Sequence, residues 1–81
     1  MSAYPGVCGL SLAAAARMRG LRAGLGWTQR RLAAESGVSQ GMVCALEAGR
    51  RNFTLPALER LAAALRVRPS DLLAPRPGEG W

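Results

Sequence analysis

The stretch from Thr28 to Ala48 constrains the fold of this chain more than any other feature of its sequence. Thr28 and Ser39 are residue types that commonly cap the start of a helix, and each precedes a short amphipathic segment. Gly37 lies between the two segments, where glycine readily adopts the left-handed backbone that ends a helix. The pattern therefore predicts two short helices joined by a turn of three residues.

The packing of these two helices, 29–36 and 40–48, depends on a few contact positions. The residue where the helices cross must be small, and Ala33 is. A core residue must follow the turn glycine, and Val38 does. The remaining shared core positions are also apolar: Leu32, Val43 and Leu46. Because all of these features occur together at the required offsets, we predict a helix-turn-helix.

One further helix precedes this motif. Its apolar residues recur at spacings of three and four and would form one buried face: Ala14, Met18, Leu21 and Leu25. The pattern predicts a helix over 12–25, with Ser11 as its N-cap and Gly26 at its end.

Two more helices follow the motif. Thr54 is the expected N-cap of a helix over 55–65, and Pro56 falls in its first turn, where the missing N–H costs nothing. The apolar stripe of this helix is Leu55, Leu58, Leu61, Ala62 and Leu65. Pro69 begins a short helix that ends at Leu73. No segment alternates with a period of two, so the predicted fold class is all-α with five helices.

The length of 81 residues leaves room for one core, so we expect a single domain. The expected helix-turn-helix domain covers residues 12–74. Residues 1–11, which contain Pro5 and Gly6, are predicted to form a flexible N-terminal arm, and residues 75–81 a flexible C-terminal tail.

The charge of the chain is strongly positive. The formal net charge is +6, and all eleven basic residues are arginine. Arginine carries a rigid fork of donors that fits phosphate oxygens and the edge of guanine. The balance indicates a polyanionic partner. A genome rich in G and C is an alternative reason for the absence of lysine, but it does not explain where the arginines lie.

Other classes of function find little support in the sequence. Cys8 and Cys44 are too few for a disulfide framework or a tetrahedral metal site, so we expect free thiols, no metal and no cofactor. The chain has no histidine, no paired carboxylates and no phosphate loop, so we expect no enzyme. We expect no small-molecule ligand, no membrane segment and no signal peptide, and a cytoplasmic location.

The stretch from Met18 to Leu73 resembles the Cro/C1-type (XRE) helix-turn-helix family. Among the matching pieces are Trp27-Thr28-Gln29, Gly37-Val38-Ser39, Leu46-Glu47-Ala48-Gly49-Arg50-Arg51-Asn52 and Asp71-Leu72-Leu73. The resemblance implies a compact five-helix, lambda-repressor-like DNA-binding domain whose third helix enters the major groove. It also implies that the protein binds operator DNA as a dimer.

The resemblance implies that the third helix reads bases with its outward residues, which are Gln40, Gly41, Cys44 and Ala45. The amide of Gln40 can pair with adenine N6 and N7, so Gln40 is the expected base reader. The family often carries Arg, Gln, Ser or Thr on this face, whereas here the face is short and mostly apolar. Methyl contacts to thymine or recognition of DNA shape are then the expected sources of discrimination.

The residues expected to contact DNA phosphates are Arg22, Thr28, Gln29, Arg30, Arg31, Ser39, Arg50, Arg51 and Asn52. A helix N-terminus attracts a phosphate, which would offset the unfavourable charge of Arg30 and Arg31 in the first turn of their helix; a solvated face is the alternative. In the family, the loop 50–52 lies along the DNA backbone. The resemblance also implies an ion pair of Arg22 with Glu47 that ties the first helix to the third and holds Arg22 against a phosphate.

The expected oligomeric state is a homodimer, because a single recognition helix gives a small interface with DNA. Apolar residues near the C-terminus are candidates for the subunit contact, unless they close the monomer core: Leu65, Val67, Leu72 and Leu73. The leading function is a transcriptional regulator that binds specific sequences in double-stranded DNA. The alternatives are a protein-interaction module, such as the antitoxin of a toxin-antitoxin pair, or a restriction-modification controller protein.

Overall fold

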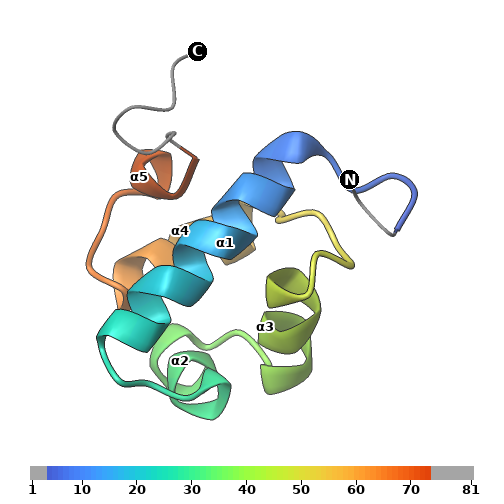
Figure 1. Ribbon diagram of the computed structural model, residues 1–81. Coiled ribbons are helices and arrows are strands. Elements are labelled where there is room, and N and C mark those ends of the chain that lie inside the picture. The colour runs from blue at the N-terminus through green and yellow to red at the C-terminus, as the bar shows by residue number, and fades with distance from the viewer. Residues whose placement is uncertain (1–3, 74–81) are drawn as a thin grey trace.

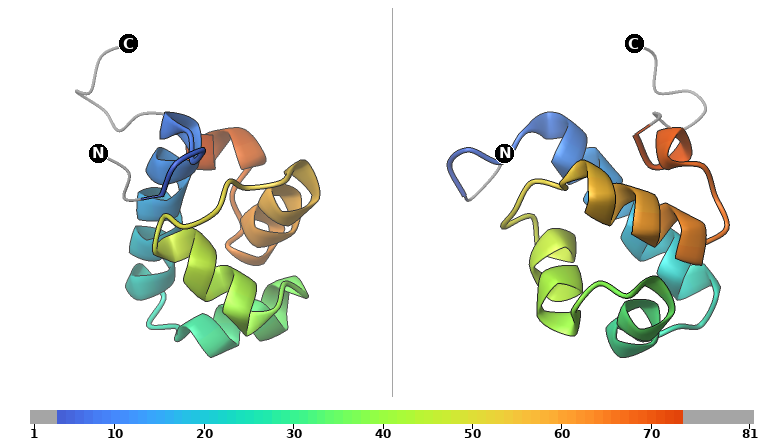
Figure 2. Two further views of the ribbon diagram at one scale, coloured as in Figure 1. Left: turned by 90° about the vertical axis from the view of Figure 1, so that its right-hand side faces the viewer. Right: turned by 180° about the vertical axis from the view of Figure 1, so that it is seen from behind.

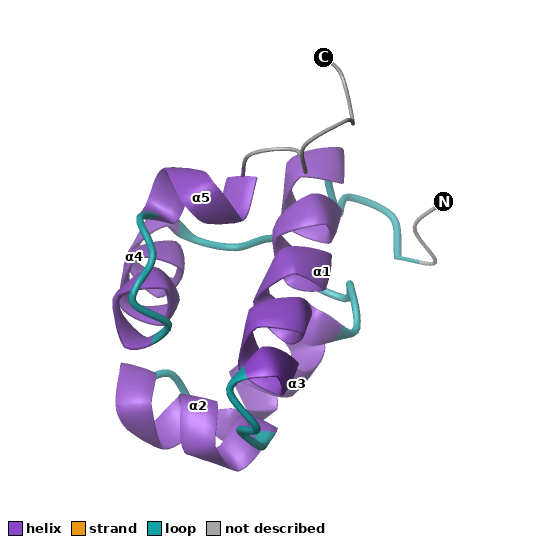
Figure 3. Ribbon diagram, turned by 60° about the vertical axis from the view of Figure 1, so that its left-hand side comes forward, coloured by secondary structure: helices purple, strands orange, loops and turns teal. Residues whose placement is uncertain are grey.

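The chain folds into five helices connected by short loops, as the computed structural model describes for residues 4–73 (Figure 1, Figure 3). The helices are α1 (Gly9–Gly24), α2 (Gln29–Ser36), α3 (Gln40–Glu47), α4 (Leu55–Ala64) and α5 (Pro69–Leu73). No strand occurs in the described part of the chain, and the predicted all-α class with five helices is confirmed. The predicted domain end at residue 74 and the predicted tail 75–81 lie outside the described residues.

The helices pack around α1 and α4. α1 packs against α3 and α5, and α2 packs against α3 and α4. α2 and α3 lie together at one end of the molecule, whereas α5 lies at the other end (Figure 1, Figure 2). This arrangement leaves one side of α3 without a covering helix.

One hydrophobic core joins all five helices. The largest fully buried side chains come from every helix: Met18, Leu32, Val43, Leu46, Leu61 and Leu72. Helices as short as α2 and α3 are marginal in isolation, so this shared core holds them in place. The core residues predicted for the helix-turn-helix, Leu32, Val38, Val43 and Leu46, are confirmed as buried.

The ends of the central helices follow the predicted local rules. Thr28 Oγ1 accepts the backbone N–H of Arg31 at 3.0 Å, and Ser39 Oγ accepts that of Met42 at 3.1 Å. Gly37 has the left-handed φ of 76° that the turn requires. α2 has the bounds predicted for it, whereas α3 and α4 each end one residue before their predicted ends.

The start of α1 differs from the prediction. The helix begins at Gly9, with Cys8 as its N-cap, three residues before the predicted start at residue 12. The boundary predicted for the arm 1–11 is therefore wrong. Ser11 is not the N-cap but a buried residue of the first turn, and its hydroxyl accepts the N–H of Phe53 at 3.0 Å. A contact 42 residues away along the chain thus overrides the local cap signal.

Two apolar residues expected in the core lie at the surface instead. Leu25 is 51% exposed and Leu55 is 80% exposed. Leu25 follows the last residue of α1, and Leu55 is the first residue of α4, so both lie where a helix leaves the core. The proposed C-terminal apolar patch is also corrected, because Leu65 and Leu72 are buried and Val67 and Leu73 pack against the core. These residues close the monomer core.

Arg66 occupies a position that favours glycine. Its φ is 60°, and it follows α4 with its N–H bonded to the carbonyl of Ala63 at 3.1 Å. A side chain in this left-handed conformation costs about 1–2 kcal/mol, part of which glycine loses again as backbone entropy. We expect Arg66→Gly to raise the free energy of unfolding by about 0.5–1 kcal/mol, as measured by urea unfolding.

Arg60→Gly is the matched control for this substitution. Arg60 is exposed within α4, where glycine is unfavourable by about 1 kcal/mol relative to a good helix former. The two substitutions should therefore shift the unfolding midpoint in opposite directions. A loss of stability in both variants would contradict the assignment of strain to Arg66.

Candidate nucleic-acid interface

Most residues predicted to contact DNA belong to α2, α3 or the loop that follows α3, and α2 and α3 lie together at one end of the molecule (Figure 1). Three segments form this candidate interface: the start of α2, the outer side of α3, and the loop 50–53 that follows α3. The packing of α2 on α3 and of α1 on α3 brings the first two segments together.

The outer side of α3 is short and carries few polar groups. Gln40 and Gly41 are exposed, and Cys44 and Ala45 are half-buried, whereas Val43 on the opposite side is fully buried. No atom outside the helix lies within 4 Å of the position that a Cβ on Gly41 would take. The four predicted base readers therefore lie on one side of α3, and among them only Gln40 offers a strong side-chain donor together with a strong acceptor, since the Cys44 thiol is weak in both roles.

Glu47 joins the first three helices behind this surface. Its carboxylate accepts the Nε of Arg22 on α1 at 2.6 Å and Nη2 of the same residue at 3.0 Å. The amide Nε2 of Gln29, the first residue of α2, donates to the same carboxylate at 3.1 Å. The Glu47 side chain is only 3% exposed, and the predicted ion pair with Arg22 is confirmed.

The donors of Arg22 are largely used within the protein. Its Nη1 donates to the carbonyl of Trp27 at 2.7 Å, in addition to the two bonds to Glu47. The hydrogen bond to Glu47 raises the pKa of the guanidinium further above its ordinary value. The Arg22 side chain is only 17% exposed. It therefore supports the interface from within the protein and presents little free charge at the surface.

Gln29 also differs from its expected role. The resemblance implied that its amide faces a phosphate, but the N–H of this amide points to Glu47. The bond ties the start of α2 to the end of α3, two segments 18 residues apart in sequence. No local sequence pattern links the two positions, so this bond was not predicted.

The two arginines at the start of α2 are not equivalent. Arg31 forms an ion pair with Glu35 at 2.9 Å, and its guanidinium lies 4.9 Å from the centroid of the Trp27 ring. Arg30 is exposed, and no hydrogen bond or ion pair joins its side chain to any residue in the described range 4–73. The free charge at this helix start therefore belongs to Arg30.

The loop after α3 presents two more arginines. Arg50 and Arg51 are exposed, and Nη2 of Arg50 donates to the sulfur of Cys44 at 3.7 Å. This contact places the Arg50 guanidinium beside the outer side of α3. Neither arginine forms an ion pair with a described residue.

Asn52 has a different place from the one expected. Its Nδ2 donates to the carbonyl of Gly6 at 2.8 Å, and its Oδ1 accepts the N–H of Cys8 at 2.8 Å. The side chain thus faces the N-terminal segment rather than a ligand surface. These two bonds give the amide a structural role, and the phosphate contact expected of Asn52 stays a prediction.

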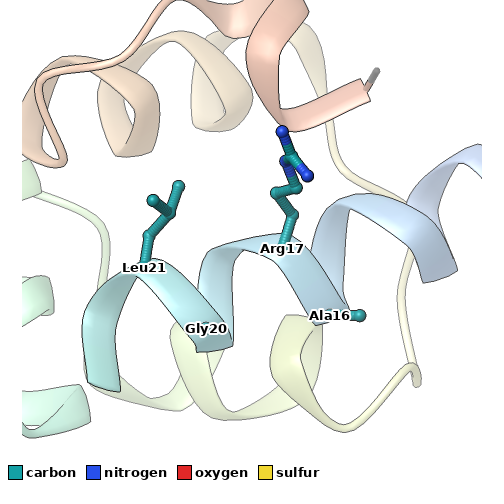
Figure 4. A pocket seen from close by; sticks show the side chains of 4 residues that line it. All are labelled: Ala16, Arg17, Gly20 and Leu21. Carbon is teal, nitrogen blue, oxygen red and sulfur yellow. The ribbon is translucent and has the colours of Figure 1, made fainter. Parts of the chain in front are cut away.

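Other kinds of site receive no support from the described residues. Within residues 4–73, no three side chains of His, Cys, Asp or Glu come together to hold a metal ion, and Cys8 and Cys44 are free. An open hollow on α1 is lined by Ala16, Arg17, Gly20 and Leu21 (Figure 4). Arg17 there donates to the carbonyl of Asp71 at 3.0 Å and so ties α1 to α5. None of the described helices is both long and apolar enough to cross a membrane.

Known proteins share this arrangement. A helix-turn-helix family model, HTH_3, matches residues 18–72. A hypothetical transcription factor from Neisseria meningitidis is 41% identical over 58 residues, which make up 72% of this chain and 55% of that protein. The chain thus matches little more than half the length of that relative.

Two further proteins are similar to this chain. The HTH-type transcriptional regulator y4dJ from Sinorhizobium fredii is 46% identical over 55 residues, covering 68% of this chain and 71% of that protein. The crystal structure of the restriction-modification controller protein C.AhdI from Aeromonas hydrophila has a TM-score of 0.72 and 35% identity, covering 76% of this chain and 94% of that one. The residues that the family model matches include α2, α3, α4 and the loop between α3 and α4.

Proposed function

This chain belongs to the Cro/C1-type helix-turn-helix family of DNA-binding transcriptional regulators, and we propose that it binds operator DNA as a homodimer with α3 in the major groove. The observation that carries the proposal is the open outer side of α3, flanked by exposed arginines that have no acidic partner within residues 4–73. These are Arg30 at the start of α2 and Arg50 and Arg51 in the loop after α3.

In this proposal, contacts with DNA phosphates supply most of the binding affinity. Arg50 and Arg51 follow the C-terminal end of α3, and Arg30 lies in the first turn of α2, so the three arginines come from the segments that precede and follow the helix proposed to enter the groove. The backbone N–H groups at the start of α2 add a partial positive charge that favours a phosphate. Such contacts fix the register of the protein on the duplex but carry no direct information on sequence.

The reading of bases rests on few groups. Gln40 supplies the amide that can bind adenine N6 and N7. Ala45 and the half-buried Cys44 offer small apolar contacts suited to the methyl group of thymine. Sequence-dependent shape of the duplex supplies the remaining discrimination.

A dimer follows from the size of this surface, because one short recognition helix covers few base pairs. Two subunits would place two copies of α3 in successive major grooves. The regulator would act in the cytoplasm, on the nucleoid. Sedimentation of the protein with and without a duplex containing its operator tests this, since one dimer per duplex is expected and one monomer would contradict it.

A restriction-modification controller role is the second candidate. The supporting observation is the similarity to the controller protein C.AhdI, which extends over 94% of that chain. The test is the position of the operator: a controller would bind upstream of a gene for a restriction enzyme or its methyltransferase.

A mobility-shift assay with fragments from upstream of the protein's own gene tests the central proposal. We expect one fragment to form a discrete complex that survives an excess of unrelated duplex. Failure to shift any native promoter fragment would contradict the proposal.

Gln40→Ala is expected to change the choice among operators. A bidentate amide–adenine contact gives about 1–3 kcal/mol of discrimination, so the variant should lose up to about a hundredfold preference at one base pair of each half-site. Affinity for unrelated duplexes should stay the same, because Gln40 is not a phosphate contact. Competition binding with single-base variants of the operator measures this. An unchanged ranking of these variants would show that Gln40 does not read a base.

A further inference from the structure

Three hydrogen bonds hold the loop after α3 to the N-terminal segment and to the first turn of α1. Asn52 Nδ2 donates to the carbonyl of Gly6 at 2.8 Å, and Asn52 Oδ1 accepts the N–H of Cys8 at 2.8 Å. The hydroxyl of Ser11 accepts the N–H of Phe53 at 3.0 Å. We name this set of bonds the clasp; the segment and loop that it joins lie side by side in Figure 2.

The loop is also fixed at its beginning. Gly49 is buried with a left-handed φ of 72°, and a Cβ at this position would come within 3.0 Å of Leu12 Cδ2 on α1. α1 therefore packs directly on the residue before Arg50. Packing holds one end of the loop at Gly49, and the clasp holds the other end at Asn52 and Phe53.

Arg50 and Arg51 lie between these two fixed points. Apart from the contact of Arg50 Nη2 with the Cys44 sulfur at 3.7 Å, neither side chain has a polar partner among the described residues, so the backbone of the loop sets the region in which their charges lie. A loop that is ordered before binding does not lose that conformational freedom when it meets a ligand.

We propose that Asn52 is a positioning residue, which holds the loop so that Arg50 and Arg51 meet DNA phosphates without further ordering. The inference rests on the proposed function and adds a role for the N-terminal segment. Arg50 and Arg51 act on DNA, and Asn52 acts through them.

The two Asn52 bonds of the clasp are suited to this role because they lie outside the core, unlike the bond of Phe53 to the buried Ser11. Gly6, Cys8 and Asn52 are exposed, and the described segment before α1 supplies none of the fully buried side chains. Loss of the two Asn52 bonds should therefore change the loop more than the stability of the whole fold.

Asn52→Ala tests the proposal, with affinity measured by fluorescence anisotropy on the promoter fragment. We expect affinity to fall about tenfold, because the loop must then be ordered on binding. The same substitution in an Arg50→Ala/Arg51→Ala background should have almost no further effect on affinity. This non-additivity separates positioning of the arginines from a general structural defect.

Thr54→Ala is the matched control. Thr54 lies two residues from Asn52, and its hydroxyl caps α4 by accepting the N–H of Ala57 at 3.2 Å. Its loss should lower the unfolding midpoint and leave affinity within about twofold.

Amide hydrogen exchange gives a readout without DNA. We expect faster exchange at the Cys8 amide in Asn52→Ala, because that N–H loses its acceptor. Two results would overturn the positioning role of Asn52 alone. One is wild-type affinity in Asn52→Ala, and the other is an equally large loss of affinity when Arg50 and Arg51 are already absent. Absence of any DNA binding by the unaltered protein would overturn the proposed function as well.

Discussion

Replacing Glu47 with alanine should lower the free energy of unfolding by about 3 kcal/mol, because it breaks a buried ion pair and leaves the other charge in place. The Glu47 side chain is 3% exposed and accepts two N–H groups of Arg22 and one of Gln29. Its removal leaves the largely enclosed Arg22 guanidinium with the backbone carbonyl of Trp27 as its remaining hydrogen-bond acceptor among residues 4–73. A loss of this size is a large share of the stability of a small domain.

The same substitution should weaken DNA binding by at least about tenfold. Glu47 holds α1, α2 and α3 together behind the candidate interface, so its loss releases the start of α2 from α3. Misplacement of these elements removes phosphate and base contacts together, each of which contributes about 1 kcal/mol or more. Urea unfolding followed by circular dichroism and anisotropy on the promoter fragment measure the two effects separately.

Glu35→Ala is the matched control for Glu47→Ala. Glu35 also pairs with an arginine, Arg31, but its side chain is 44% exposed and the pair lies on one helix at spacing i, i+4. Such exposed pairs contribute about 0.3–0.5 kcal/mol. Equal losses of stability in the two variants would contradict the role given to Glu47.

Replacing both Arg50 and Arg51 with alanine should produce the largest change in DNA binding. Each phosphate contact releases counterions and contributes about 0.9 to the slope of log affinity against log salt concentration. Loss of two contacts per subunit should therefore reduce that slope by about 2 for each subunit bound. The affinity for the promoter fragment and the affinity for unrelated duplexes should fall by similar factors, since phosphate contacts do not distinguish sequences.

A variant with the same net charge controls for this effect. Arg60 and Arg66 are exposed on α4 and immediately after it, outside the candidate interface. Arg60→Ala/Arg66→Ala removes two positive charges as well, but it should leave most of the slope intact because these charges lie off the DNA. If both double variants reduce the slope equally, overall charge rather than the loop controls binding.

Local signals in the sequence were sufficient to predict the centre of the fold. α2 has the predicted bounds because a cap at Thr28 and a left-handed glycine at Gly37 are both adjacent to the helix that they limit. The start of α1 was not predictable in this way. The hydroxyl of Ser11 binds Phe53, a partner that the sequence around Ser11 does not reveal.

In the candidate interface, too, some contacts were predicted from the sequence and others were not. The pair of Arg22 with Glu47 was predicted through the family resemblance, not from spacing, and it is confirmed. The bonds of Asn52 to Gly6 and Cys8 had no local signal and were missed. The pair of Arg31 with Glu35, in contrast, has helical i, i+4 spacing and could have been predicted from the sequence. It would have distinguished Arg31, whose charge is paired, from Arg30, which has no ion pair within residues 4–73.

The salt dependence of binding to the promoter fragment, and to an unrelated duplex of equal length, measures the arginine contacts with DNA phosphates directly. Arg30, Arg50 and Arg51 in each subunit of a dimer predict a slope of about 5 on the promoter fragment. We also expect a modest ratio between the two affinities, because the outer side of α3 carries few base-reading groups. A slope near zero, or no binding at low salt, would contradict arginine contacts with the DNA backbone and the proposed function with them.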